Sequence, residues 1–200
     1  SFGSAGTRTA AIAAGGENPS AYQAKTEIYN GTSWAEVNDL NVAKANLGSA
    51  SNGTTTASLI FGGLNTAQPE YNLKTTELWN GYVWTEVNDM NTQRYGPRGA
   101  GTSTSALAIG GNQFPTGPAP GYKDQTESWN GTNWTEVNDL NTARNVGYGV
   151  GADNTSALAF GGNPNSKATE SWNGTNWTEV NDMNVARYDF GGGGIQTSAL

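Results

Sequence analysis

The chain lacks the two residue types on which most nucleophilic and transition-metal sites depend. Its 200 residues include no His and no Cys. A Ser-His-acid or Cys-His arrangement is therefore impossible, and so is a zinc or copper site built from imidazole or thiolate ligands. The absence of Cys also means that the fold needs no disulfide. We expect a protein without catalytic residues, metal or cofactor.

Carboxylates are the remaining groups that could do chemistry, and most of them recur four times. Two carboxylates at a suitable separation can hydrolyse a glycoside, but a fourfold identical set better suits ion pairs with recurring basic residues and Asp-stabilised turns. The recurring sets are Glu27, Glu77, Glu127 and Glu170; Glu36, Glu86, Glu136 and Glu179; and Asp39, Asp89, Asp139 and Asp182. A glycosidase would need at least one acid outside them, for which the sequence offers Glu17, Glu70, Asp124, Asp153 and Asp189.

A recurring Asn-Asp-x-Asn run, first seen at Asn38 to Asn41, offers oxygen ligands for a hard cation. Calcium takes six to eight such ligands, yet the run lacks the glycine and the distal glutamate of a known calcium loop. A turn whose side chains bond to the backbone is the favoured interpretation.

The carboxylates belong to an eleven-residue phrase that occurs four times. It spans Asn30 to Leu40, Asn80 to Met90, Asn130 to Leu140 and Asn173 to Met183. Self-similarity at a fixed period of 20–50 residues marks a repeat architecture, because a single unit cannot bury its apolar face alone.

One unit contains four short strands, which we call a to d. In the third unit these are 96–102, 104–109, 126–130 and 133–137, with an Asn-Gly turn between c and d. Asn-Gly between alternating runs is the strongest short hairpin signal, and such strands predict an all-β fold. Glycines on strand a suit a crowded axis, and Trp on strand d suits the wide outer wedge of a β-propeller. We therefore expect the strand-d tryptophans between blades: Trp34, Trp84, Trp134 and Trp177.

The whole chain is predicted to form a single β-propeller domain, 1–200, with four complete blades of four antiparallel strands at about 1–41, 46–91, 95–141 and 145–184. A partial fifth blade at 188–200 supplies only its first strands, since Asp189 to Leu200 aligns without gaps on Ser1 to Ile12. We favour a piece of a five-bladed or larger propeller, completed by further residues or by a partner. The alternative is a closed ring of four blades with a displaced tail. An unpaired a–b edge invites self-association.

The order of these features resembles the kelch repeat: an apolar run, Gly-Gly, a variable loop, Thr-Glu-x-aromatic, a turn, Trp and a basic residue. Lys44, Arg94, Arg144 and Arg187 stand where that repeat has its terminal Arg, whereas the Asn-Gly at the c–d turn departs from it. The recurring wording also resembles propeller proteins encoded by marine bacteriophages, some labelled galactose-oxidase-like. That family's copper ligands include His, so its activity does not carry over to this chain.

Charge and hydropathy exclude several partners. The net charge is −7 and the isoelectric point is near 4.5, which argues against nucleic acid, a ligand of basic stripes, and against an anionic membrane surface. No apolar run approaches the ~20 residues of a membrane helix.

The loops between strands b and c vary in length and sequence while the strands around them barely change. They span 17–25, 64–75, 112–125 and 163–168. Variable loops on a rigid scaffold are a usual place for recognition, and in these loops aromatic side chains lie among amides, which suits a carbohydrate or a protein surface. The candidate ligand-binding residues are Tyr22, Tyr71, Phe114 and Tyr122.

From the sequence we expect a non-enzymatic recognition module that binds a host-surface glycan or protein through its b–c loops. The phage resemblance implies a virion or extracellular location. A purely structural protein that self-assembles through the incomplete fifth blade is the second hypothesis, and a carboxylate-based glycosidase is the third.

Overall fold

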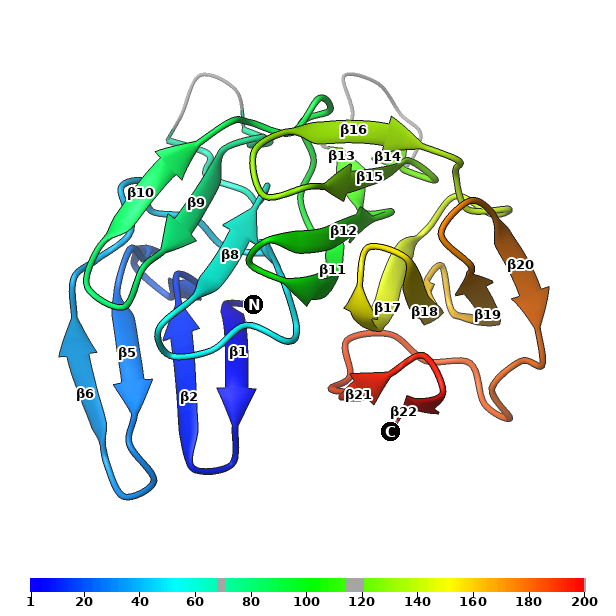
Figure 1. Ribbon diagram of the computed structural model, residues 1–200. Coiled ribbons are helices and arrows are strands. Elements are labelled where there is room, and N and C mark those ends of the chain that lie inside the picture. The colour runs from blue at the N-terminus through cyan, green and yellow to red at the C-terminus, as the bar shows by residue number, and fades with distance from the viewer. Residues whose placement is uncertain (68–70, 114–120, 200) are drawn as a thin grey trace.

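The computed structural model describes residues 1–67, 71–113 and 121–199, which form an all-β structure. Four four-stranded antiparallel sheets follow one another around a common centre, and the first strand of each sheet lies innermost (Figure 1). This arrangement is a four-bladed β-propeller, as the repeat predicts. In the described part of the chain, no helix is long and apolar enough to cross a membrane.

Each blade takes its strands in the order a, b, c, d. Blade 1 consists of β1 (Gly3–Thr7), β2 (Ala10–Ala14), β5 (Thr26–Tyr29) and β6 (Trp34–Val37). Blade 2 consists of β7 (Gly48–Ser49), β8 (Ser58–Phe61), β9 (Thr76–Trp79) and β10 (Trp84–Val87). Blade 3 consists of β11 (Arg98–Thr102), β12 (Ser105–Ile109), β15 (Thr126–Trp129) and β16 (Trp134–Val137). Blade 4 consists of β17 (Asn145–Asp153), β18 (Ser156–Asn163), β19 (Ser166–Trp172) and β20 (Trp177–Val180).

Three small hairpins complete the strands. Two of them extend b–c loops: β3 (Glu17–Asn18) with β4 (Ala21–Tyr22), and β13 (Asn112–Gln113) with β14 (Gly121–Tyr122). The third, β21 (Gly194–Ile195) with β22 (Ser198–Ala199), is the a–b hairpin of the partial fifth blade.

The Asn-Gly turn between strands c and d is built as the sequence indicates. In blade 1 the Asn30 side-chain oxygen accepts hydrogen bonds of 3.0 Å from the backbone N–H groups of Thr32 and Ser33. Gly31 has a φ of 94°, in the left-handed region that glycine enters without strain. The turn places Tyr29 directly opposite Trp34, so the two aromatic residues of each blade meet across the c–d pair.

Neighbouring blades approach most closely at their inner strands. A Cβ added to Gly99 on β11 would lie 1.8 Å from the Ser49 carbonyl oxygen on β7. No side chain fits in that space, which is why strand a of each unit is rich in small residues.

The core consists of three clusters, one between each pair of adjacent blades. Each cluster takes aliphatic residues from both blades and both aromatic residues of the c–d pair from the second. Trp84, Trp134 and Trp177 are only 5–6% exposed. Trp34 differs from the sequence expectation, because its side chain is 50% exposed. No other described segment packs on the outer face of blade 1, so Trp34 has no neighbouring blade to pack against.

Buried ion pairs join the blades at their outer strands. The basic residue that ends one blade contacts the strand-c glutamate of the next: Lys44 with Glu77 at 2.9 Å, Arg94 with Glu127 at 2.9 Å, and Arg144 with Glu170. All six side chains are 0–2% exposed. The expected pairing of strand-c glutamates with the recurring base is therefore confirmed for Glu77, Glu127 and Glu170, and it operates between blades. Burial lowers the pKa of Lys44 and of Arg94, and the facing glutamate opposes that shift.

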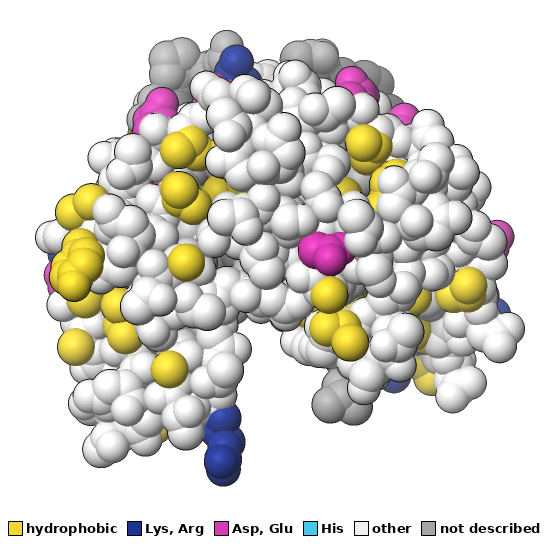
Figure 2. All heavy atoms as spheres, in the orientation of Figure 1, with side chains coloured by type: hydrophobic (Ala, Val, Ile, Leu, Met, Phe, Trp, Pro, Cys, Tyr) yellow, Lys and Arg dark blue, Asp and Glu magenta, His cyan; other side chains and the backbone are white. Residues whose placement is uncertain are grey.

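The propeller is not closed. Blade 1 and the β21–β22 hairpin lie on the two sides of an opening in the arc of blades (Figure 1), and the space-filling view shows the same notch in the surface (Figure 2). A cavity of about 320 Å³ lies there, lined by residues of β1 and by Gly192, Gly193 and Gly194.

Candidate binding site

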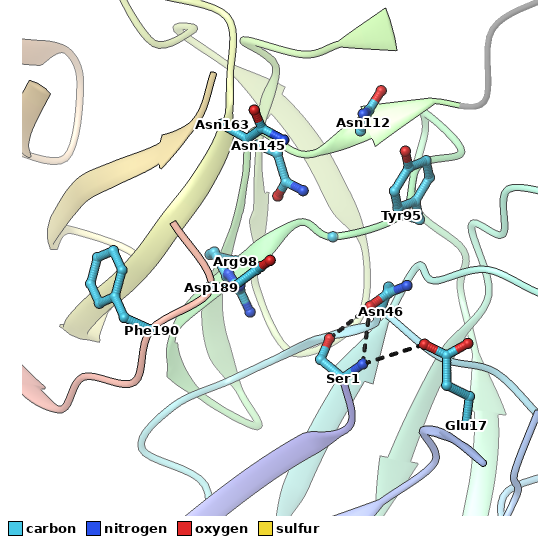
Figure 3. Close-up of a pocket in the computed structure, with 11 residues that line it drawn as sticks. Ser1, Glu17, Asn46, Tyr95, Arg98, Asn112, Asn145, Asn163, Asp189 and Phe190 are labelled. Atoms are coloured by element: carbon cyan, nitrogen blue, oxygen red, sulfur yellow. Dashed lines mark hydrogen bonds and ion pairs between the residues drawn. The ribbon is translucent and has the colours of Figure 1, made fainter. Parts of the chain in front are cut away.

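A cavity of about 630 Å³ lies at the centre of the propeller, on the face where the b–c and d–a loops emerge. Every blade and the start of the fifth contribute to it (Figure 3). Its lining residues are Ser1, Glu17, Asn46, Tyr95, Gly96, Arg98, Asn112, Asn145, Asn163, Asp189 and Phe190. Most of them carry amide, phenol or charged groups, so the cavity is a polar site.

Two backbone pairs bring these residues to the axis. In blade 3, Tyr95 and Asn112 exchange N–H···O bonds of 2.8 and 2.7 Å. In blade 4, Asn145 lies opposite Asn163 in the β17–β18 ladder. In each pair, one residue directly follows the recurring arginine and the other directly follows the Gly-Gly of strand b. In blades 3 and 4 the repeat therefore delivers two side chains per blade to the same place.

The residue two positions after the recurring base turns the chain into the inner strand. It has a left-handed φ in three units: 50° at Asn46, 64° at Gly96 and 52° at Asp189. Asn, Gly and Asp are the residues that tolerate this conformation best. All three line the cavity, so the turn at the start of strand a also shapes the site.

The lining positions differ between units although their neighbours repeat. The residue after Gly-Gly is Glu17, Leu64, Asn112 or Asn163, and the residue after the recurring base is Ala45, Tyr95, Asn145 or Tyr188. Of these, Glu17, Tyr95, Asn112, Asn145 and Asn163 line the cavity. This variation is the signal in the sequence that could have revealed the site. It is easily missed, because the two varying positions are far apart along the chain and only the propeller places them side by side.

Two amide oxygens in the site have no hydrogen-bond partner among the described residues. These are Oδ1 of Asn112 and Oδ1 of Asn145, and both atoms are buried within the protein surface. The Asn145 side chain also lies so close to Gly96 that a Cβ there would come within 2.9 Å of its oxygen. A polar acceptor that is held in place without a partner is costly for folding alone, and it suits a ligand that donates a hydrogen bond.

The charged groups of the site are partly balanced. The Arg98 guanidinium lies 4.0 Å from an Asp189 carboxylate oxygen, and its Nε donates a 3.1 Å hydrogen bond to the Val146 carbonyl. Burial lowers the pKa of Arg98, and Asp189 opposes that shift. Burial also raises the pKa of Tyr95, and a hydrogen bond with the Asn112 side chain opposes that shift. The phenol is protonated near neutral pH, as tyrosine ordinarily is.

Of the four aromatic residues predicted from the b–c loops, the three that the structure describes do not line the cavity. Tyr22 lies opposite Glu17 in the β3–β4 pair, and Tyr122 lies opposite Asn112 in the β13–β14 pair, so both stand one strand away from lining residues. Tyr71 is 53% exposed. Phe114 lies outside the described residues.

The non-repeated acids are spread over the molecule. Glu17 and Asp189 line the cavity, whereas Asp153 lies in the a–b turn of blade 4, where it accepts hydrogen bonds from the Thr155 N–H and hydroxyl. The backbone carbonyl of Asp124 accepts a 3.0 Å hydrogen bond from the N–H of Leu140, in the loop after β16. Glu70 lies outside the described residues.

The Asn-Asp-x-Asn runs are occupied by contacts within the protein. Asn41 donates to Glu77 from both its backbone and its side chain, and Asp39 lies 3.2 Å from Lys25. Across the ranges 1–67, 71–113 and 121–199, no three acidic side chains gather in a way that could hold a metal ion.

Comparison with known proteins adds no family to this geometry. No protein-family model matches the chain, and no curated protein matches it. What the chain shows by itself is a β-propeller of four-stranded antiparallel blades.

Proposed function

We propose that this β-propeller is a non-enzymatic recognition module that binds a hydroxyl-rich ligand, such as a glycan, in the cavity at its axis. The observation that carries the proposal is the cavity of about 630 Å³, lined by the positions that vary between otherwise repeated units. Variation confined to one place on a repeated scaffold is what recognition requires, because the scaffold keeps its packing while the site changes.

The chemistry of the lining favours a neutral polar ligand. Asparagine side chains both donate and accept hydrogen bonds, which matches sugar hydroxyl groups, and the Tyr95 ring offers an apolar face beside them. The two partnerless oxygens, on Asn112 and Asn145, add acceptors that a hydroxyl donor would satisfy. The net charge of −7 disfavours a polyanionic ligand.

The kelch-like order of features and the phage-like wording of the repeat favour a host-surface glycan as the ligand, with the propeller carried on a virion. On this proposal the β3–β4 and β13–β14 hairpins, with Tyr22 and Tyr122, form the rim of the site and make secondary contacts with a longer chain of sugars. Hydrolysis is the weaker alternative, which rests on the presence of Glu17 and Asp189 in the lining.

A glycan array followed by calorimetry tests the proposal. Asn112→Leu and Asn145→Ala should each weaken binding of an array hit about 3- to 10-fold, because each removes a hydrogen bond worth roughly 0.5–1.5 kcal/mol. Tyr82→Ala is the matched control, since Tyr82 is 79% exposed on the c–d turn of blade 2, away from the cavity.

Two results would contradict binding at the axis. The first is an array without a hit, and the second is a hit whose affinity falls with Tyr71→Ala and Phe114→Ala but not with the cavity variants. Release of shorter sugars, abolished by Glu17→Gln or Asp189→Asn, would favour the glycosidase.

A further inference from the structure

Three internal interfaces show how one blade recognises the next. At each, the basic residue and the Asn three positions before it bind the strand-c glutamate of the following blade. At the first interface, Lys44 Nζ lies 2.9 Å from Glu77, and Asn41 donates to Glu77 from its backbone at 2.7 Å and from its side chain at 3.0 Å. The second and third interfaces repeat these contacts with Asn91, Arg94 and Glu127, and with Asn141, Arg144 and Glu170.

A hydrogen bond in the opposite direction completes each interface. The strand-d Trp of the following blade donates its indole N–H to the strand-c Thr of the preceding blade: Trp84 to Thr26 at 2.9 Å, Trp134 to Thr76 at 2.9 Å and Trp177 to Thr126 at 3.0 Å. Each interface is therefore directional. One face presents base, Asn and Thr, and the other presents Glu and Trp.

The outer face of blade 1 presents the second half of this pattern without the first. Glu27 is exposed and Trp34 is 50% exposed. Together with Lys25, Gln23 and Ala13 they line a groove of about 430 Å³ on this face. In the three ranges that the structure describes, Glu27 has no ion-pair partner.

The far end of blade 4 presents the first half without the second. Asn184 and Arg187 occupy the places of Asn41 and Lys44, and both are exposed. Arg187 forms no ion pair with a described residue. Thr169, the counterpart of Thr26, is not reached by an indole N–H, and its hydroxyl makes only a 3.5 Å contact with the Lys167 carbonyl.

We propose that these two ends bind each other between copies of this chain, head to tail, with blade 4 of one copy against blade 1 of a second copy. Arg187 and Asn184 would hold Glu27 of the second copy, and its Trp34 would donate to Thr169. The occupant follows from charge and hydrogen-bond complementarity, since the exposed Arg187 and Asn184 match Glu27, and Thr169, which is 6% exposed, matches Trp34. Within one copy the opening of the arc keeps the two ends apart (Figures 1 and 2).

The β21–β22 hairpin stands in the way of this contact and has to move. Its Gln196 donates to the Trp172 carbonyl at 2.5 Å and to Ser171 Oγ at 2.9 Å. Asn154 of the β17–β18 turn makes the same two contacts with Trp129 and Ser128 of blade 3. The hairpin therefore occupies on blade 4 the place of the a–b hairpin of a following blade.

The β1–β2 hairpin of the second copy should displace the β21–β22 hairpin from this position on blade 4. β1 and β2 are joined by five residue pairs, and β2 continues into β5 by four more, whereas β21 and β22 share two pairs. Arg8, which aligns with Gln196, is exposed at the β1–β2 turn and would take over its contacts. A directional contact of this kind produces rings or filaments instead of a closed twofold dimer.

Light scattering coupled to size exclusion, over a range of concentrations, tests the proposal on the 200-residue chain. The mass is expected to rise above 20.9 kDa as concentration increases. Arg187→Glu and Glu27→Arg should each give a monomer, because each places like charges in contact. A mixture of the two variants should again form larger species in which the two variants alternate, because each contact between unlike chains pairs opposite charges. The chain that carries both changes should again form larger species.

Controls separate this contact from a general effect of charge. Lys74→Glu and Glu136→Arg make the same charge changes at exposed positions of blades 2 and 3 and should leave the association unchanged. Gln196→Ala should lower the concentration needed for association several-fold, because it loosens the β21–β22 hairpin. A wild-type chain that stays monomeric at every concentration would overturn the proposal, as would association that both charge reversals leave intact. Either result would mean that the exposed faces of blades 1 and 4 meet within one copy or bind a different partner.

Discussion

Blades 1 and 3 carry the same strand-c glutamate and strand-d tryptophan, but a preceding blade covers only those of blade 3. Trp134 in blade 3 is 6% exposed and Trp34 in blade 1 is 50% exposed. Glu127 is fully buried against Arg94, whereas Glu27 is exposed. A repeat motif thus specifies which groups can meet, and the neighbouring unit decides whether they do. Stability in such a chain resides in the contacts between units.

The largest difference between the two blades in the stability cost of a substitution is expected at the strand-c glutamate. Glu127→Gln leaves the buried Arg94 guanidinium without its counter-charge and should cost about 3–5 kcal/mol of unfolding free energy. Glu27→Gln, the same change on the exposed face, should stay within about 0.5 kcal/mol. Urea unfolding followed by tryptophan fluorescence measures both, at a concentration where the protein is monomeric. Equal costs would show that the ion pair is not the source of the difference.

Substitution of the strand-d tryptophan should show a smaller difference in stability cost between blade 3 and blade 1. Trp134→Phe removes buried indole surface and the hydrogen bond to Thr76, and should cost about 2 kcal/mol. Trp34→Phe removes neither a buried contact of that size nor a hydrogen bond to a neighbouring blade, so its cost should stay below about 1 kcal/mol. Urea titrations of the two variants and the wild type measure both costs in unfolding free energy. A Trp34 variant that is as damaging as the Trp134 variant would mean that the blade 1 face is covered in solution.

The a–b turns of blades 4 and 1 also differ in whether their central residue contacts a preceding blade. Asn154 links blade 4 to blade 3 through Ser105, Ser128 and the Trp129 carbonyl, so Asn154→Ala should cost about 1–2 kcal/mol. Arg8 has no preceding blade to reach and is exposed, so Arg8→Ala should be neutral within about 0.5 kcal/mol. Thermal unfolding of the two variants side by side provides the measurement, and an equal loss would contradict it.

The smallest expected effect is a pH dependence in the blade 4 turn. Hydrogen bonds from Thr155 lower the pKa of Asp153, whereas the corresponding turns of blades 1 and 3 place Thr7 and Thr102 beside Thr9 and Thr104. A lowered folded-state pKa stabilises the fold above the unfolded pKa of about 4, and this contribution is lost as the pH falls through the folded value.

The Asp153→Thr variant isolates this contribution. Wild type should exceed it by only about 0.3 kcal/mol at pH 6, since solvent screens a partly exposed group, and the advantage should vanish at about pH 2. Unfolding free energies of both proteins at the two pH values test the sign. An advantage that grows as the pH falls would contradict the assignment.

The strands could be predicted closely from the sequence, and the binding site could not. The b, c and d strands of the third unit, predicted at 104–109, 126–130 and 133–137, are observed as β12, β15 and β16 with ends that differ by at most one residue. Alternating side chains and Asn-Gly turns are local signals, so a short window of sequence contains them. The cavity collects single residues from every blade, and no local window indicates that they meet.

The aromatic residues predicted from the b–c loops also show that a local stretch of sequence does not reveal which residues meet in the cavity. The variable loops predict Tyr22 and Tyr122 as binding residues, but both lie on hairpins next to lining residues and not in the cavity. The lining asparagines look like ordinary turn residues when read along the chain. Asn112 and Asn145 are 33 positions apart, and the angle between successive blades is what brings them to one space.

By itself, the sequence determined the repeat, the blades, the turns and the chemistry with which one blade can recognise the next. These depend on spacing and residue type within a few tens of positions. Only the tertiary structure decided which copies of that chemistry are buried and which are exposed, and which varying residues share the axial cavity. The physical reason is that burial and proximity depend on how blades pack around a centre, and identical units in a row acquire different surroundings there.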